Sequence, residues 1–316
     1  MSAFAPRTRS KSVERPGDRI FSASTLTAGS LILALLAAVA GFLVLEGLPG
    51  VVADPSTVSI FEEGVDFTGF VIPLIFGTLW AATLALIMAL PLAIGIALFI
   101  SHYAPRAFAA GIGYVIDLLA AVPSVVFGLW GANVLAPAIQ PLYTWLADNL
   151  GWIPLFAGPA SGTGRTIFTA AIVLAVMVLP IITAISREVF LQTPALYEEA
   201  ALALGATRWE MIRTVVLPFG RPGIVSGAML GLGRALGETM AVAMVLSASG
   251  VITFNLIGSV NPSTIAANVA LRFPEAYGIN VNVLIATGLI LFAITLVVNS
   301  IARYALNRRK EFSGAN

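Results

Sequence analysis

Long apolar runs alternate with short polar segments along this chain, and the pattern predicts an all-α membrane protein. A helix needs about 20 apolar residues to cross the hydrocarbon core of a bilayer. Six runs reach this length, and we predict six transmembrane helices over residues 27–48, 70–101, 107–136, 166–186, 223–248 and 282–302. The membrane domain is then 26–305, between a disordered basic tail at 1–25 and a second tail at 306–316.

The first run raises the question of a cleaved leader, because Ala38-Val39-Ala40 imitates a signal-peptidase site. The apolar run continues past it to Leu48, so we expect an uncleaved span. Pro91 lies inside the second run and predicts a kink.

Composition agrees with the pattern. Hydrophobic residues make up 58% of the chain and charged residues only 10%, whereas soluble domains carry about 25% charged residues. The chain has no cysteine, which excludes disulfides and thiolate metal sites, and its one histidine, His102, is expected to be an ordinary loop residue. Because no nucleophile–base pair or metal-ligand cluster is visible, we expect neither enzyme activity, nor a cofactor, nor nucleic-acid binding.

Lysine and arginine predict the orientation, because they favour the cytoplasmic side. Of the 17 Lys and Arg residues, Arg165 and Arg272 fall in loops that are external when both termini are cytoplasmic, and Arg234 falls in a span. All others are then cytoplasmic. The acidic loop 54–66 becomes external, which agrees with the same topology.

A cytoplasmic hairpin is predicted at 193–218, TPALYEEAALALGATRWEMIRTVVLP. Thr193 can cap a helix that begins at Pro194, and Gly205 is a natural stop. Thr207 and Glu210 have the spacing of a capping box, so a second helix starts there and Pro218 ends it. By itself the hairpin could simply link two spans or present an alanine-rich surface to another protein.

Arg234 and Glu238 are the two charges inside the fifth predicted span, in GLGRALGETM at 231–240. An Arg at the centre of a spanning helix costs about 2.5–3.5 kcal/mol on insertion scales. Four residues apart on one helix, the two side chains share a face. They form either a structural ion pair or part of an anion path, in which the guanidinium binds oxyanion oxygens. Nearby glycines allow close helix packing or room for a solute.

Three motifs resemble known permease families. Glu199-Ala200-Ala201, three residues, Gly205, nine residues and then Val215-x-Leu217-Pro218 resemble the EAA loop of ABC importer permeases. GLGRALGETMAV at 231–242 and AVPSVVFGLWG at 121–131 resemble the PstC family of phosphate permeases, with Phe127 where a Tyr is common. The resemblance covers about 65–305 and implies a type I ABC importer (MetI-like) permease fold in the bacterial inner membrane.

The resemblance also implies the partners and the roles of residues. The hairpin would dock on an ATPase subunit through Glu199, Ala200, Ala201, Gly205, Leu217 and Pro218. Arg234 and Glu238 would serve phosphate transport by alternating access. The expected partners are a second, PstA-like permease, two PstB-like ATPase subunits that bind ATP–Mg, and an external PstS-like phosphate-binding protein. This chain has no GxxxxGK[ST] string, so a partner must hydrolyse the ATP.

Several roles stay open at this stage. Glu238 either accepts a hydrogen bond from protonated phosphate, which sulfate cannot donate, or only balances Arg234. Thr239 either offers a hydroxyl to the path or bonds its own backbone. Asp117 is expected to pair with Arg106 or Arg187 or to cap a helix. The rival functions are a permease for sulfate or molybdate, an ion-coupled secondary transporter, and a membrane scaffold.

Overall fold

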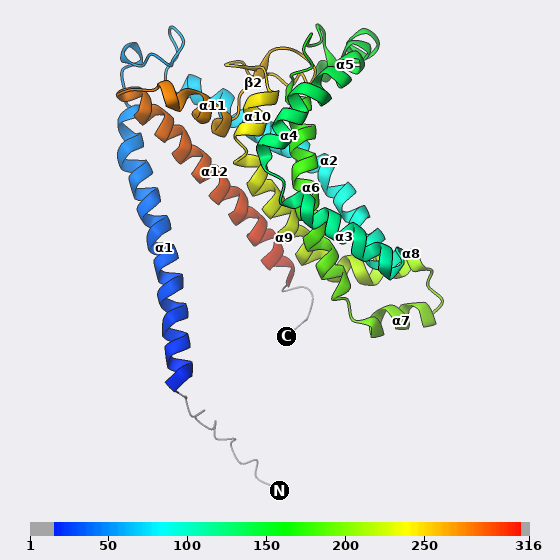
Figure 1. Ribbon diagram of the computed structural model, residues 1–316. Coiled ribbons are helices and arrows are strands. Elements are labelled where there is room, and N and C mark those ends of the chain that lie inside the picture. Colours follow the sequence, from blue (N-terminus) through cyan, green and yellow to red (C-terminus); the bar gives the residue numbers. More distant parts are fainter. Residues whose placement is uncertain (1–15, 311–316) are drawn as a thin grey trace.

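The computed structural model describes residues 16–310, and these are mostly helical. Six helical segments are long and apolar enough to cross a membrane, which confirms the six-span, all-α architecture (Figure 1). They are Gly17–Val51, Phe67–Tyr103, Ser124–Leu150, Ile167–Leu191, Arg208–Leu236 and Ile279–Tyr304. Residues 1–15 of the expected tail and 311–316 lie outside the described part.

Three helices form the centre of the bundle: α2 (Phe67–Leu98), α6 (Ile167–Leu191) and α9 (Leu217–Leu236). The face of α2 in this core is made of alanines, and Ala85, Ala89 and Ala93 are fully buried. Small side chains allow helix backbones to approach closely, which is how membrane helices gain packing without a hydrophobic driving force. α6 is the most enclosed of the six spans, with α2 and α9 packed against it.

The first helix stands apart from this bundle. α1 (Pro16–Val51) contacts α12 (Ile279–Lys310) at the upper end in Figure 1 and then diverges from it. Gly50 makes the contact possible, because a Cβ there would overlap the backbone nitrogen of Val283. The helix begins at Pro16, so the expectation of disorder throughout 1–25 is wrong for its last ten residues.

The predicted third span, 107–136, is two helices. α3 (Arg106–Ala120) ends before Pro123, and α4 (Ser124–Trp130) begins after it. A proline disfavours helical backbone in the residue before it, so the apolar run contains a break that hydropathy does not reveal. A π-helical turn at Gly131–Leu135 then leads into α5 (Ala136–Leu150), which continues beyond the predicted end of the span at 136. The candidate span is therefore Ser124–Leu150.

The hairpin is present, but its ends differ from expectation. α7 (Ala195–Ala203) is capped by Pro194, and Thr193 makes no capping bond. Gly205 has φ +89°, the left-handed conformation that glycine adopts without strain. The Thr207–Glu210 capping box that starts α8 (Arg208–Met211) is confirmed. Pro218 does not end this helix, because a π-helical turn at Ile212–Val216 carries it into α9, with Pro218 in the first turn.

The predicted fifth span, 223–248, is interrupted as well. α9 ends at Leu236, and the short helix α10 (Met240–Val245) follows a break at Gly237–Thr239. Beyond it lie β1 (Ala248–Ser249), β2 (Asn261–Pro262), which pairs with β1 in parallel, and α11 (Ile265–Arg272). The remaining short elements are Pro55–Thr57, Phe99–Tyr103, Pro154–Phe156 and Phe273–Glu275.

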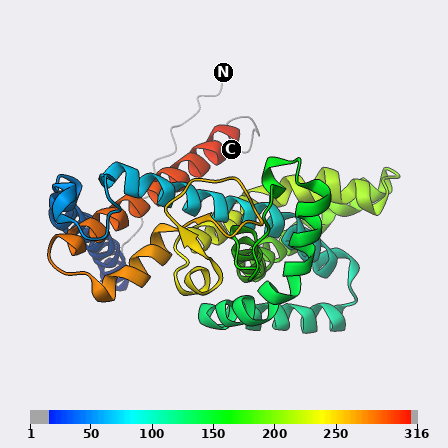
Figure 2. The same cartoon turned by 90° about the horizontal axis from the view of Figure 1, so that it is seen from above.

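Loops and short elements form a cap over one end of the bundle, seen from above in Figure 2. The buried side chain of Asn261 holds this cap to α6, since its Oδ1 accepts from the backbone N–H of Ile167 at 2.9 Å. Thr78 of α2 likewise accepts from the N–H of Ile265 at 2.9 Å. The start of α1, the end of α12 and α7 all lie toward the opposite end (Figure 1), and which end faces the cytoplasm stays a prediction.

Candidate functional site

Arg234 lies in the last turn of α9, and it is not paired with Glu238. The expected shared face requires one continuous helix from 234 to 238, but α9 ends at Leu236. At the break, Thr239 has φ −110° and ψ −70°, which redirects the chain. No ion pair joins Arg234 to Glu238 among the described residues. The structure therefore corrects the i, i+4 interpretation.

Arg234 instead lines a cavity of about 490 Å³ between α9 and α12. Its Nε is buried and has no hydrogen-bond partner in the described part of the chain. Arg303 of α12 lines the same cavity, which is completed by Ser226, Met229, Leu230, Gly233, Asn299 and Ala302. Two guanidinium groups on one cavity, without a carboxylate among its lining residues, favour an anionic ligand.

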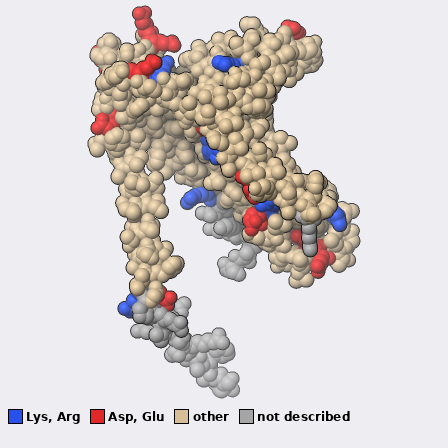
Figure 3. All heavy atoms as spheres, viewed as in Figure 1, with Lys and Arg blue, Asp and Glu red and all other residues tan. Residues whose placement is uncertain are grey.

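Arg303 was missed from the sequence, where it counted only as a charge that sets topology. It follows Arg234 by 69 positions, and no spacing rule connects two residues on different helices. The contact between α9 and α12 brings them together. In Figure 3 charged side chains are sparse over the spanning region, so two guanidinium groups on one cavity are unusual for this molecule.

Glu238 is 8% exposed and has a defined backbone partner. Its Oε1 accepts from the backbone N–H of Ala241 at 3.1 Å, in the first turn of α10. Carboxylates stabilise the first turn of a helix in this way. α10 is itself anchored, because Ala241, Val242 and Val245 are buried. Thr239 donates to the carbonyl of Gly237 at 3.1 Å, so its hydroxyl does bond local backbone.

The glycines around Arg234 allow both close helix packing and open space for a solute. A Cβ on Gly231 would lie 3.0 Å from Ile182 of α6, so this glycine permits close helix packing. Gly233 has open space beside it and lines the cavity.

The hairpin presents the EAA-type residues to solvent. Glu199, Ala200, Gly205 and Pro218 are exposed, and Ala201 and Leu217 pack against the cluster of Phe190, Met211, Ile212 and Val216. The surface beside them is apolar: Leu204 is 90% exposed, with Leu196, Tyr197 and Trp209 also exposed. Exposed apolar side chains at a helix hairpin are typical of a protein contact.

Two side-chain contacts hold the hairpin side of the molecule. His102 approaches Glu198 of α7 with Nε2 and Oε1 3.4 Å apart, so the histidine joins the end of α2 to the hairpin. Arg187 of α6 lies 3.8 Å from Asp117 of α3, one of the pairings expected for Asp117. Asp117 therefore belongs to the contact between α3 and α6 and not to the cavity of Arg234.

Comparison with known proteins identifies the family. The sequence model described as "Binding-protein-dependent transport system inner membrane component" matches residues 89–311. A protein of Mycobacterium tuberculosis named "Phosphate transport system permease protein PstC 2" is 45% identical over 92% of this chain and 91% of its own length. A protein of Mesorhizobium japonicum named "Phosphate transport system permease protein PstC" is 40% identical over 94% of this chain and 92% of its own.

Solved structures agree on the fold. A chain of a bacterial alginate ABC transporter, in complex with an alginate-bound periplasmic protein, matches with a TM-score of 0.60 at 16% identity, covering 95% of this chain and 96% of that one. A chain of the MetNI methionine ABC transporter in an inward-facing conformation gives 0.52 at 16% identity, covering 77% and 99%. With six apolar spans, the chain is a multi-pass protein of the bacterial inner membrane. It belongs to the binding-protein-dependent transport system inner membrane components and, among these ABC importer permease subunits, to the PstC family.

Proposed function

We propose that this chain forms part of the phosphate path of an ATP-driven importer. The main support for an anion path is the position of Arg234. Its buried Nε has no hydrogen-bond partner among the described residues, and its side chain lines a cavity together with Arg303. The names of relatives that are 40–45% identical over at least nine-tenths of this chain select phosphate among the oxyanions.

The side chains of the path have different roles. Arg234 attracts the anion, and Arg303 extends the positive lining of the same cavity. Glu238 holds α10 at the break and accepts a hydrogen bond from protonated phosphate when the path opens toward it. Thr239 adds a hydroxyl oxygen that can accept a hydrogen bond, since its proton is donated to the carbonyl of Gly237. A carboxylate repels sulfate, which carries no proton near neutral pH, so Glu238 contributes to selectivity.

The energy comes from ATP bound with Mg²⁺ by a partner subunit. The exposed hairpin, with Glu199 and Ala200 at its surface, docks on that ATPase. A second permease chain completes the path, two ATPase subunits close beneath the pair, and an external binding protein delivers phosphate. Both termini are then cytoplasmic, on the side of α7. Closure of the ATPases draws the hairpins together and opens the path outward, and ADP release returns it inward.

The alternative substrate is another oxyanion, such as sulfate or molybdate, which two guanidinium groups also fit. Family membership removes the ion-coupled transporter and the scaffold from consideration. Competition by sulfate and molybdate against phosphate uptake separates the remaining substrates.

The test is phosphate uptake in cells that lack this chain and are complemented with wild type, Arg234→Gln or Glu199→Lys, with co-purification of the subunits. We expect Arg234→Gln to abolish uptake in an assembled complex. Arg221→Gln is the matched control, because Arg221 is exposed on the same helix and does not line the cavity. Loss of the complex in Arg234→Gln would make the residue structural, and full uptake in Glu199→Lys would contradict docking through the hairpin.

A further inference from the structure

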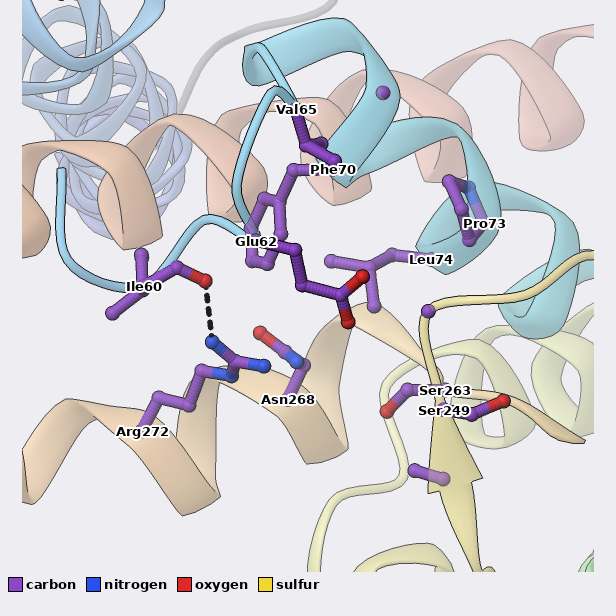
Figure 4. A pocket seen from close by; sticks show the side chains of 13 residues that line it. Ile60, Glu62, Val65, Phe70, Pro73, Leu74, Ser249, Ser263, Asn268 and Arg272 are labelled. Atoms are coloured by element: carbon purple, nitrogen blue, oxygen red, sulfur yellow. Dashed lines mark hydrogen bonds between the residues drawn. The ribbon is translucent and has the colours of Figure 1, made fainter. Parts of the chain in front are cut away.

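A second polar pocket lies at the other end of the molecule, away from the hairpin. It has a volume of about 210 Å³ and is built by three segments distant in sequence (Figure 4). The loop before α2 contributes Glu62, the β1 segment contributes Ser249, and α11 contributes Asn268 and Arg272. Under the predicted topology, this is the external mouth of the permease.

Asn268 is the residue that most requires a ligand. Its side chain is 7% exposed, and its Oδ1 is buried without a hydrogen-bond partner among the described residues. A buried acceptor without a donor is unfavourable, because it has lost its hydrogen bonds to water and gained none in return. Because Asn268 lines the pocket, a ligand that donates a hydrogen bond would remove this cost.

Arg272 is held at the edge of the pocket by two contacts. Its Nη1 donates to the backbone carbonyl of Ile60 at 2.7 Å, and its guanidinium carbon lies 5.5 Å from the centre of the Phe70 ring. These contacts fix the orientation of a group that has five N–H donors. The described protein uses one of them in a hydrogen bond, which leaves others for a ligand.

Glu62 projects its carboxylate into the pocket from the opposite side of Asn268 (Figure 4). Gly250 leaves the room for it, since a Cβ there would lie 3.3 Å from Oε1 of Glu62. No ion pair joins Glu62 to Arg272 in the described residues. The pocket thus offers a cationic donor and two separate acceptors that do not satisfy each other.

We propose that this pocket is an entry site for phosphate in its protonated forms, a proposal that rests on the proposed function. Arg272 binds the unprotonated oxygens, and Glu62 and Oδ1 of Asn268 accept from P–OH groups. H2PO4− donates to both acceptors, and HPO4²⁻, which has one P–OH group, donates to one of them. Sulfate carries negative charge but no such donor, so it leaves both acceptors unpaired and meets the Glu62 carboxylate. Selection for phosphate then begins before the anion reaches Arg234.

The test uses the absence of cysteine from this chain. Ser249→Cys places one thiol in the pocket, and Ser56→Cys places one on an exposed site of the same side, outside it. The full complex in lipid vesicles is treated with a small thiol reagent under three conditions: inorganic phosphate present, sulfate present, or neither anion present. Modification of this chain is followed by mass spectrometry. Phosphate uptake is measured on the same wild-type vesicles.

We expect phosphate to slow modification several-fold at position 249 but not at 56, and sulfate to slow neither. Adding Glu62→Gln should let sulfate protect position 249, whereas Glu63→Gln, next to it and outside the pocket, should change nothing. Equal protection by both anions, or none by phosphate, overturns the proposal. If wild-type vesicles take up phosphate but phosphate does not protect position 249, only the entry site is rejected. If phosphate protects position 249 but wild-type vesicles take up no phosphate, only the transport function is rejected.

Discussion

Glu238 links the helix break to anion selection, and the two roles can be separated. Glu238→Gln keeps an oxygen that can accept from the N–H of Ala241 but removes the negative charge. We expect the complex to assemble and sulfate to compete with phosphate more strongly, by about tenfold for a lost discrimination of about 1.4 kcal/mol. Uptake of labelled phosphate against increasing sulfate measures this. Glu188→Gln, an exposed position on α6, is the control, and unchanged competition would leave Glu238 a helix cap only.

Asp66 predicts a pH dependence of stability at the start of α2. Its carboxylate accepts from the N–H of Gly69 at 2.8 Å and from the hydroxyl of Thr68 at 2.8 Å, and these bonds lower its pKa below the usual value. A lowered pKa stabilises the folded state above the unfolded pKa of about 3.9, and the contribution disappears as pH falls through the folded pKa.

Asp66→Asn keeps the cap oxygen without the charge. We expect wild type to melt at a higher temperature at pH 7 and the difference to shrink below about pH 4, where the Asp66 carboxylate becomes protonated. Glu63→Gln, in the loop and not at a helix terminus, controls for the loss of one negative charge. A difference that is constant with pH would contradict this origin.

At the scale of elements, close packing of α4 on α10 positions the site. A Cβ on Gly128 would lie 2.8 Å from the Cα of Ala241 and 3.0 Å from the sulfur of Met244. Gly128→Ala should therefore separate the two helices and destabilise the fold by about 1–3 kcal/mol, the range for overpacking. The melting temperature of the purified complex and its uptake rate measure the effect. Gly95→Ala is the control, because a Cβ at this position of α2 has no atom of another segment within 4 Å. It should change neither the melting temperature nor the uptake rate.

The helix ends also show where sequence patterns were sufficient. The Thr207–Glu210 box and the turn at Gly205 are local, so neighbouring residues alone determine them. The break at Pro123 was missed because the run stayed apolar on both sides. Pro218 was wrongly predicted to end a helix. A π-helical turn before it lets the chain continue directly into α9.

At the scale of the whole molecule, most of α1 lies apart from the helix bundle. Toward its start α1 diverges from α12 (Figure 1), and Leu33 there is 70% exposed. Because the chain has no cysteine, Leu33→Cys gives a unique site for a short cross-linker. We expect a cross-link from there to the second permease chain in the assembled complex. Absence of this cross-link in an assembled complex would mean that lipid alone surrounds α1.

The sequence by itself determined the class of protein, the number of spans and the three family motifs. These depend on composition, on run length and on residues close together in the chain. It also pointed to Arg234 and Glu238, because charges in an apolar run are visible without a structure.

Only the tertiary structure decided what those charges contact. Arg234 and Arg303 line one cavity because α9 packs on α12, and Glu238 caps α10 because the helix stops at Leu236. The outer pocket brings Glu62 together with Asn268 and Arg272, about 200 positions later, through loops that carry no periodic signal. Helix packing and loop paths create such sites, and neither is encoded by local pattern.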